Sequence, residues 1–394
     1  MSSAYIRQEH QQLREEVREL FASEVLPHAD EWERERQVPR RIWAEMGARG
    51  LLGLHYPEAV GGAGKDLFHS VVLLEELGRT GYTGFRVAIA VHAYMATSYL
   101  AHAGGPALVQ RYLAPAIAGT KIAALALTEP DAGSDLSRLQ TVAVRDGDSY
   151  VIDGRKKFVA NGTVADFVIV AVRTGAAAPK GGAGGLSMIV VDSDSPGLDR
   201  TRLDNLGWHS SDTVELTLDG VRVPAENLIG SENRGFLYLM RCLQLERLAA
   251  GILALGGIDR CLELTWQYIS QRKIYGGTIS KLQAVRHRMA ELVTEATAVR
   301  QLAYHAAWLY DHGDPPVAEC SMVKLKATEL AVRVAQECMQ FHGADGYQSA
   351  SAVSRMYRDA QAATIAGGAS EVLRDLLAQA TFEDAAWRRR RFSS

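Results

Sequence analysis

Glu246 is the residue of this sequence whose surroundings most strongly suggest acid–base chemistry. Its neighbours at helical spacing are apolar, and a carboxylate on an apolar helix face costs free energy unless it is paired or functional. These neighbours are Leu239, Cys242, Ala249, Ala250 and Leu253. Arg247 is adjacent in sequence but points elsewhere on a helix, so it does not automatically neutralise the carboxylate. Two interpretations stay open: a catalytic base, or a glutamate paired with a basic group from another helix.

A second group of residues suited to ligand binding is formed by Thr128, Gly133 and Ser134. Small residues let the main chain approach a planar or phosphorylated ligand, and hydroxyl groups can hydrogen-bond to its edge. Taken alone, however, the Gly-Ser-Asp sequence is typical of an ordinary turn.

Other motifs for metals or nucleotides are incomplete. The 11 histidines show no paired ligand spacing, and the four cysteines lie far apart without a CxxC pair, so we expect no metal site and buried free thiols in a reducing compartment. The segment Pro57–Asp66 lacks the first glycine and the final Ser or Thr of a phosphate loop. Gly175–Gly185 lacks the GxGxxG order and is predicted to be an inter-strand loop.

Composition limits the class of protein. A chain of 394 residues with 47% hydrophobic residues can bury the cores of two or three domains. Its formal charge of -3 gives no polycationic surface, so nucleic acid is not expected as a partner. Neither a secretory signal nor a stretch long enough to cross a membrane is recognisable, which favours a cytoplasmic protein. Arg388–Arg391 is interpreted as a solvated tail, with a docking patch for an acidic partner as the alternative.

The hydrophobic period predicts helices, then strands, then helices again. The first third is helical, with one helix over Ser70–Leu77 after a turn-rich break. From about Ile122 the period approaches two, and Asp146-Gly147 and Asp153-Gly154 are predicted turns. The predicted strands are Tyr150–Ile152, Phe167–Val172, Leu186–Val191 and Val214–Leu218.

The C-terminal part returns to a helical pattern after Val223-Pro224. One helix is expected around Phe236 to Gly257. A second has its apolar positions between Val285 and Leu309 and is ended by Gly313 and Pro315-Pro316, and a third covers about Val317 to Phe341 and ends at Gly343. The expected division is therefore an N-terminal helical domain (1–121), a middle β-domain (122–231) and a C-terminal helical domain (232–394).

The segment Ala126-Leu-Thr-Glu-Pro-Asp-Ala-Gly-Ser-Asp135 resembles the signature loop of the acyl-CoA dehydrogenase family of flavoproteins. The order of helices, β-domain and helices is similar to that family over nearly the whole chain. The resemblance implies an α+β multidomain fold whose middle domain is a β-barrel or sandwich and whose C-terminal domain is a four-helix bundle. It also implies FAD, a homotetramer built as a dimer of dimers, and an electron-transferring flavoprotein as partner.

The resemblance assigns cofactor contacts to several segments. The residues from Leu125 to Ser134 would flank the flavin, and Phe158 would cover it, while Ala160 stands where relatives have a hydroxyl residue and keeps only the main-chain N–H. Arg272, Gln283 and Gln340 would reach the adenosine diphosphate part across a subunit interface. The implied FAD contacts are Leu125, Leu127, Thr128, Gly133, Ser134, Phe158, Ala160, Arg272, Gln283, Gln340, Gly343, Ala369, Ser370 and Glu371.

The resemblance also assigns the base. Leu243–Leu248, which contains Glu246, resembles the base-bearing segment of the long-chain and isovaleryl members. Thr364–Val372 resembles the segment that carries a glutamate base in many relatives, but Gly367 stands at that position and keeps only the N–H that polarises the thioester carbonyl. The implied catalytic residues are thus Glu246 and Gly367. The implied substrate contacts are Ser134, Gln244, Arg247, Ala366 and Gly368.

We therefore expect FAD-dependent α,β-dehydrogenation of an acyl-CoA thioester in fatty acid or branched acyl metabolism. One alternative is a substrate tethered to an acyl carrier protein, for which the Arg388–Arg391 tail and Arg138 give weak support. Another is a flavin-binding relative without dehydrogenase chemistry. Ala160 and Gly367 favour that alternative, whereas Glu246 and the near-neutral charge oppose it.

Overall fold

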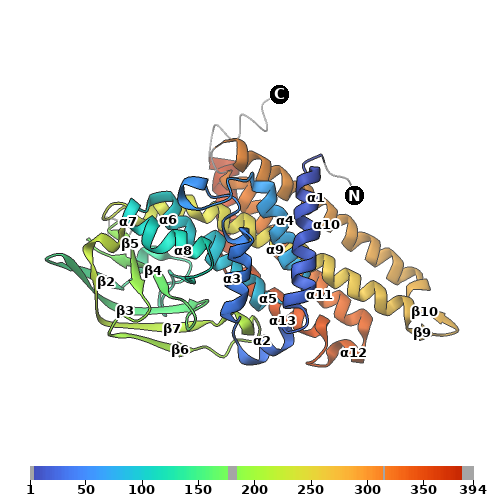
Figure 1. Ribbon diagram of the computed structural model, residues 1–394. Coiled ribbons are helices and arrows are strands. Elements are labelled where there is room, and N and C mark those ends of the chain that lie inside the picture. Colours follow the sequence, from blue (N-terminus) through green and yellow to red (C-terminus); the bar gives the residue numbers. More distant parts are fainter. Residues whose placement is uncertain (1–3, 176–183, 314–315, 384–394) are drawn as a thin grey trace. The chain divides into compact units, whose positions relative to one another are not determined.

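The computed structural model describes residues 4–175, 184–313 and 316–383 of the chain (Figure 1). The chain is divided into two compact units. Unit 1 consists of Met1–Glu19, Val71–Thr83 and Gln244–Ser394, and unit 2 of Leu20–Ser70 and Gly84–Leu243. The tail at Arg388–Arg391, Pro315, and most of the loop expected at Gly175–Gly185 lie outside the described residues.

Unit 2 contains short helices and one large sheet. The helices are α2 (Ala29–Glu35), α3 (Arg40–Ala48), α5 (Thr83–Ala90), α6 (Thr97–Ala103), α7 (Pro106–Leu108) and α8 (Ala114–Ile117). The strands are β1 (Ala123–Ala126), β2 (Val142–Asp146), β3 (Ser149–Val159), β4 (Phe167–Arg173), β5 (Leu186–Asp192), β6 (Leu198–Arg202), β7 (Val214–Pro224) and β8 (Leu228–Ile229). Within the part of the chain that the structure describes, they form an eight-stranded sheet in the order β6-β7-β3-β2-β4-β5-β8, with β1 paired in parallel to β4.

The central strand β4 is buried on both faces. Phe167, Ile169 and Ala171 belong to a core that includes Tyr99, Leu113 and other residues of the covering helices. The alternate residues Val168, Val170 and Val172 belong to a second core with inward residues of β3, β5 and β7. Burial on both faces explains why the sequence of β4 is a continuous apolar run and not an alternating one.

The four predicted strands are present as parts of longer ones, but one predicted turn is wrong. Gly147, at a φ of 59°, forms the expected turn between β2 and β3. Asp153-Gly154 instead lies inside β3, where the pairing with β7 shifts register. A Cβ on Gly154 would lie 2.5 Å from Thr141 Oγ1, and the φ of this residue is 153°. The glycine is therefore required for a β-bulge against which Thr141 packs, and not for a chain reversal.

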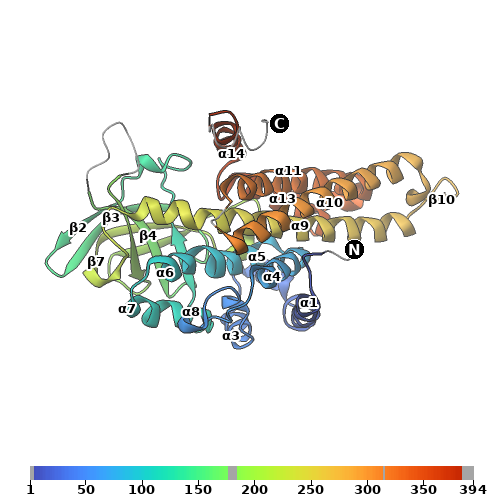
Figure 2. The ribbon, with the colours of Figure 1, turned by 90° about the horizontal axis from the view of Figure 1, so that it is seen from above.

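Unit 1 is a bundle of long helices. Its elements are α1 (Gln8–Leu20), α4 (Leu67–Arg79), α9 (Gly235–Gln271), α10 (Gln283–His312), α11 (Val317–His342), α12 (Ala344–Tyr347), α13 (Ala352–Ile365) and α14 (Ser370–Ala378), with the two-stranded pair β9 (Lys273–Ile274) and β10 (Gly277–Thr278). The helices α1, α4 and α9 run on into unit 2. Figure 2 shows α11 beside α10 and α13, against which it packs. Gly313 and Gly343 follow α10 and α11 directly, as the sequence predicts.

The helix α9 continues well beyond Gly257, where the sequence predicts its end. Gly256 lies where α9 meets α4: a Cβ on Gly256 would be 2.1 Å from the main-chain oxygen of Glu75 and 2.9 Å from Gly78 Cα. This glycine therefore allows two helices to approach closely and does not end one of them.

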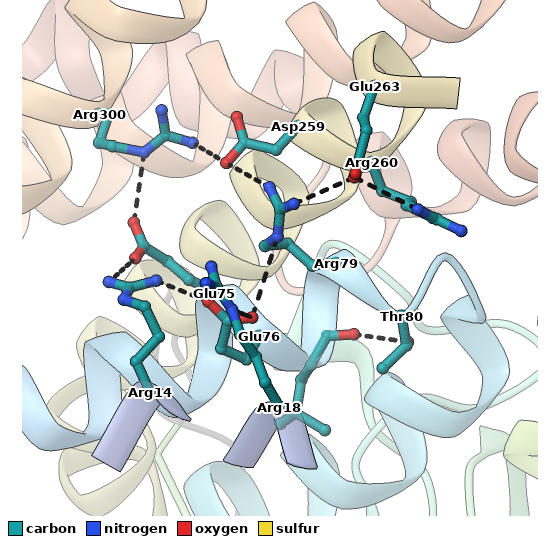
Figure 3. Close-up of polar contacts among 11 residues, drawn as sticks. Arg14, Arg18, Glu75, Glu76, Arg79, Thr80, Asp259, Arg260, Glu263 and Arg300 are labelled. Carbon is teal, nitrogen blue, oxygen red and sulfur yellow. Dashed lines mark hydrogen bonds and ion pairs between the residues drawn. The ribbon is translucent and has the colours of Figure 1, made fainter. Parts of the chain in front are cut away.

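Charged side chains join four helices of unit 1 (Figure 3). Glu75, on α4, accepts hydrogen bonds from Arg14 at 2.8 Å, from Arg300 at 3.3 Å and from the Tyr304 hydroxyl at 2.7 Å. The neighbouring Glu76 binds Arg14 and Arg18 of α1, and Arg79 binds Glu263 of α9 at 3.0 Å. Although burial opposes its charge, Glu75 and Glu76 raise the pKa of Arg14.

The four cysteines are free and buried, which confirms the predicted thiols. Among the described residues, no helix has the length and apolar character that crossing a membrane requires.

Candidate active site

Glu246 lies on α9 in unit 1 and is only 4% exposed. The two other residues predicted to contact substrate from this helix, Gln244 and Arg247, are buried to a similar degree. Arg247 Nη1 donates to Ser321 Oγ of α11 at 3.3 Å. Burial lowers the pKa of Arg247, and the negative charge of Glu246 opposes that shift. A buried carboxylate and a buried guanidinium thus act on each other on this part of α9.

The segment between α13 and α14, residues 366–369, also belongs to unit 1. Gly367 and Gly368 have φ values of 67° and 103°, which side chains other than glycine rarely adopt. A Cβ on Gly367 would meet no atom within 4 Å among the described residues, whereas a Cβ on Gly368 would lie 3.9 Å from Arg247 Nε. The predicted residues Gly368 and Arg247 are therefore neighbours, and there is open space at Gly367.

Lys324, on α11, was missed by the sequence analysis. It is wholly buried, and its Nζ donates to the main-chain oxygen of Gly368 at 2.6 Å. Burial and the nearby charge of Arg247 lower the pKa of Lys324 to about 8. The signal was weaker than at Glu246, because the neighbours of this lysine at helical spacing are small but only partly apolar: Cys320, Ser321, Ala327 and Thr328.

The predicted flavin loop lies in unit 2, after β1. Gly133 and Ser134 are exposed, and Leu125, Leu127 and Thr128 are half-buried. Thr128 Oγ1 donates to the main-chain oxygen of Lys157 at 2.5 Å, and the Lys157 N–H donates to the Thr128 oxygen at 2.8 Å. The Thr128 hydroxyl thus already donates its proton within the protein, and towards a ligand it can act only as a hydrogen-bond acceptor.

The end of β3 and the turn after it carry the other predicted flavin contacts of unit 2, with Phe158 in the strand and Ala160 in the turn. Phe158 is 61% exposed although it is aromatic, and its φ of 62° is unusual for such a residue. Asn161, whose Nδ2 donates to the Ala88 oxygen at 2.9 Å, follows Ala160 with a φ of 61°. An exposed aromatic ring held by a strained backbone is suited to covering a flat ligand.

The residues predicted for the adenosine diphosphate part gather at one end of the unit 1 bundle. Arg272 follows α9 directly, and its Nη1 lies 4.0 Å from Asp345 Oδ2, two residues beyond Gly343. The Tyr268 hydroxyl donates to the same carboxylate at 2.8 Å. Gln283 and Gln340 are exposed at the ends of α10 and α11. Tyr275 is 95% exposed in the β9–β10 turn, which leaves a large aromatic side chain available to a ligand or another subunit.

The chemistry of these residues fits FAD. Ser370, at the start of α14, is buried, and its Oγ finds no hydrogen-bond partner among the described residues. The exposed guanidinium of Arg272 suits a pyrophosphate, and exposed Phe158 suits a flat ring. A buried hydroxyl without a partner is uncommon unless a ligand or water satisfies it.

Three family models match the chain: the acyl-CoA dehydrogenase N-terminal domain over residues 7–120, the middle domain over 124–221 and the C-terminal domain over 233–382. The chain is 37% identical over 377 residues to the mitochondrial long-chain specific acyl-CoA dehydrogenase of Sus scrofa, covering 95% of this chain and 87% of that protein.

Solved structures agree with these matches. The acyl-CoA dehydrogenase of Geobacillus kaustophilus has a TM-score of 0.92 and 38% identity, covering 96% of this chain and 99% of that one. A glutaryl-CoA dehydrogenase of Mycobacterium smegmatis, solved in complex with FADH2, has a TM-score of 0.89 and 26% identity, covering 98% and 97%.

The matches over the whole chain define an FAD-dependent oxidoreductase of acyl thioesters, and buried Glu246 and the two-glycine segment next to Arg247 are compatible with it. The chain belongs to the acyl-CoA dehydrogenase family. This finding confirms the predicted family, fold class, enzyme class and cofactor. Acyl-CoA substrates and an electron-transferring flavoprotein as partner are consistent with the family.

Proposed function

We propose that Glu246 is the base that removes the α-proton of an acyl thioester and that the product is the 2-enoyl thioester. The observation that carries the proposal is the burial of this carboxylate on α9, in a chain whose position 367 has no side chain to act as base. A carboxylate kept at 4% exposure is expected to serve a function, because desolvating it costs free energy. When bound, FAD supplies the acceptor for the β-hydride.

Gly367 and Lys324 have separate parts in this proposal. The Gly367 N–H donates to the thioester carbonyl and stabilises negative charge as Glu246 takes the proton. Lys324 holds the next residue, because its Nζ binds the Gly368 oxygen at 2.6 Å. Hydrogen-bond donors act best on a developing charge when they are fixed in advance, so this buried contact supports the N–H of Gly367.

Acyl binding is assigned to Ser134, Gln244, Arg247, Ala366 and Gly368. The open space around Gly367, where a Cβ would meet nothing within 4 Å among the described residues, supports an acyl chain with bulk near its reacting carbons. Ala366 adds to that space, since its side chain is a single methyl group.

The exposed end of unit 1 is assigned to FAD of a neighbouring subunit in a homotetramer, with electron-transferring flavoprotein as the acceptor. Arg272→Ala should therefore lower flavin occupancy and weaken assembly in the same preparation. A charge-assisted contact contributes about 1.5 to 3 kcal/mol, which corresponds to roughly a tenfold or greater loss of FAD affinity. Flavin absorbance per chain and sedimentation of the same sample measure both effects.

A matched control for Arg272→Ala is Arg145→Ala, which removes an exposed arginine from β2 in unit 2. It should leave flavin content and assembly as in the parent. A stable monomer of Arg272→Ala with full flavin content would contradict the interface assignment.

The substrate class is tested by anaerobic mixing of the purified yellow protein with acyl thioesters while flavin absorbance is followed. The panel pairs straight and branched acyl groups, each offered as the CoA and as the acyl-carrier-protein thioester. We expect bleaching by acyl-CoA and formation of the 2-enoyl-CoA. Bleaching by carrier-protein thioesters alone would favour a biosynthetic dehydrogenase, and no bleaching by any thioester would contradict the proposed function.

A further inference from the structure

A buried ion pair connects the two segments of unit 2 that are assigned to the flavin. Lys156, on β3, is wholly buried, and its Nζ lies 2.8 Å from Glu129 Oε1. The same ammonium group donates to the Leu127 oxygen at 3.1 Å. Both partners of the pair are therefore removed from water, and they bind β3 to the loop that follows β1.

The carboxylate of Glu129 fixes both ends of the flavin loop. It accepts the main-chain N–H of Gln140 at 2.6 Å and that of Thr141 at 3.0 Å. Because Glu129 precedes exposed Gly133 and Ser134 in sequence and Thr141 follows them, one carboxylate closes the loop that presents these two residues.

The lysine side of the pair fixes the second flavin segment. Lys157, the next residue, exchanges two hydrogen bonds with Thr128, at 2.5 and 2.8 Å. Phe158, exposed and at positive φ, follows immediately. The loop and the end of β3 are thus joined through positions 127–129 and 156–157, so displacement of one would displace the other.

The charges are consistent with a pair that is ionised at neutral pH. Burial lowers the pKa of Lys156 to about 8, against the attraction of Glu129. Burial opposes ionisation of Glu129, but Lys156 and the two main-chain amides outweigh it and lower the pKa of that carboxyl. An apolar pair of similar volume is often as stable as a buried ion pair, so stability alone is a weak reason for these charges. Directional hydrogen bonds, by contrast, hold a loop in one conformation.

We propose that Lys156 and Glu129 are positioning residues for FAD, which hold the loop at 127–135 and the segment at 158–160, where β3 ends, in the conformation that binds the flavin. The inference rests on the proposed assignment of these two segments to the flavin. It predicts that replacing either residue of this buried pair weakens FAD binding and shifts the flavin midpoint potential.

The test titrates apoprotein with FAD, measures the midpoint potential of the reconstituted protein and records the thermal midpoint of the apoprotein. Two variants change the pair in different ways. Glu129→Gln keeps the size of the side chain and an oxygen acceptor, and Lys156→Met removes the ammonium group. Each should raise the Kd for FAD by about tenfold or more, the loss expected when a hydrogen bond to a charged group is broken.

The matched control is Arg222→Met, which breaks an ion pair between Arg222 and Asp146 in the same sheet. The side chains of Arg222 and Asp146 are 56% and 63% exposed. It should leave the Kd for FAD and the midpoint potential unchanged. Unchanged FAD affinity and potential in Glu129→Gln and Lys156→Met, together with a lower thermal midpoint, would reduce the pair to a structural role and overturn the proposal. Failure of both variants to fold would also overturn it, by making the pair a requirement of folding.

Because no thioester is present, these measurements are independent of the role of Glu246. If Glu129→Gln and Lys156→Met lose FAD affinity but Glu246 proves not to be the base, only the proposal for the base fails. If Glu246 proves to be the base but the two variants keep their FAD affinity, only the positioning proposal fails.

Discussion

Glu246→Gln is expected to keep its fold and its FAD and to reduce flavin about two to four orders of magnitude more slowly than the parent, the usual contribution of a positioned base. The amide is close to the carboxylate in size, so the packing around this buried position is retained, but the amide cannot accept the α-proton. Anaerobic stopped-flow mixing with the best acyl-CoA measures the rate of bleaching in a single turnover.

The control on the same helix is Glu263→Gln. In the parent, the Glu263 side chain is 39% exposed and binds Arg79. It should reduce flavin at the parent rate, because it changes a charge on α9 away from position 246. If Glu246→Gln bleached as fast as Glu263→Gln, the base would have to be another group.

Glu75→Gln is expected to lower the free energy of unfolding by about 3 to 5 kcal/mol, the range for removing one partner of a buried charge pair. The Glu75 side chain is only 4% exposed and meets Arg14 and Arg300, so its neutralisation removes the counter-charge that these two guanidinium groups share and leaves each with one acidic partner, Glu76 and Asp259 respectively (Figure 3). Tyr304 also loses an ionised acceptor. Urea unfolding followed by circular dichroism measures the change.

Glu295→Gln makes the same chemical change in an exposed pair between α10 and α11, with Arg333, whose side chains are 45% and 42% exposed. It should cost no more than about 1 kcal/mol. Similar losses in both variants would mean that the charges around Glu75 are not stabilised by one another.

Hydrophobic period and glycine position predicted the long C-terminal helices well. The apolar positions between Val285 and Leu309 belong to α10, and Gly313 and Gly343 follow α10 and α11 directly. The same reasoning failed at Gly154 and Gly257. Gly154 serves a β-bulge, and Gly256, the neighbour of Gly257, serves the close contact of α4 with α9. One sequence does not reveal which neighbour will come close.

The candidate site was predictable to the extent that a charged residue stood among apolar ones at helical spacing. Glu246 was singled out in this way, and it is buried on α9. Lys324, whose neighbours at helical spacing include the polar Ser321 and Thr328, does not show this pattern clearly and was overlooked. Its partner is a main-chain oxygen of residue 368, and the pairing of Lys156 with Glu129 likewise joins residues 27 positions apart. Such contacts depend on how the chain folds back, which periodicity does not encode.

The most direct test of the assigned base moves the carboxylate. Anaerobic flavin reduction is compared in the parent, in Glu246→Gly, and in Glu246→Gly combined with Gly367→Glu. The structure leaves room for the new side chain, since a Cβ on Gly367 meets nothing within 4 Å among the described residues, but its φ of 67° costs a non-glycine residue about 1 to 3 kcal/mol. We predict loss of reduction in the single variant and partial recovery in the double variant, poorer for acyl groups branched near the reacting carbons. Reduction by Glu246→Gly at the parent rate would contradict the assignment of Glu246 as the base.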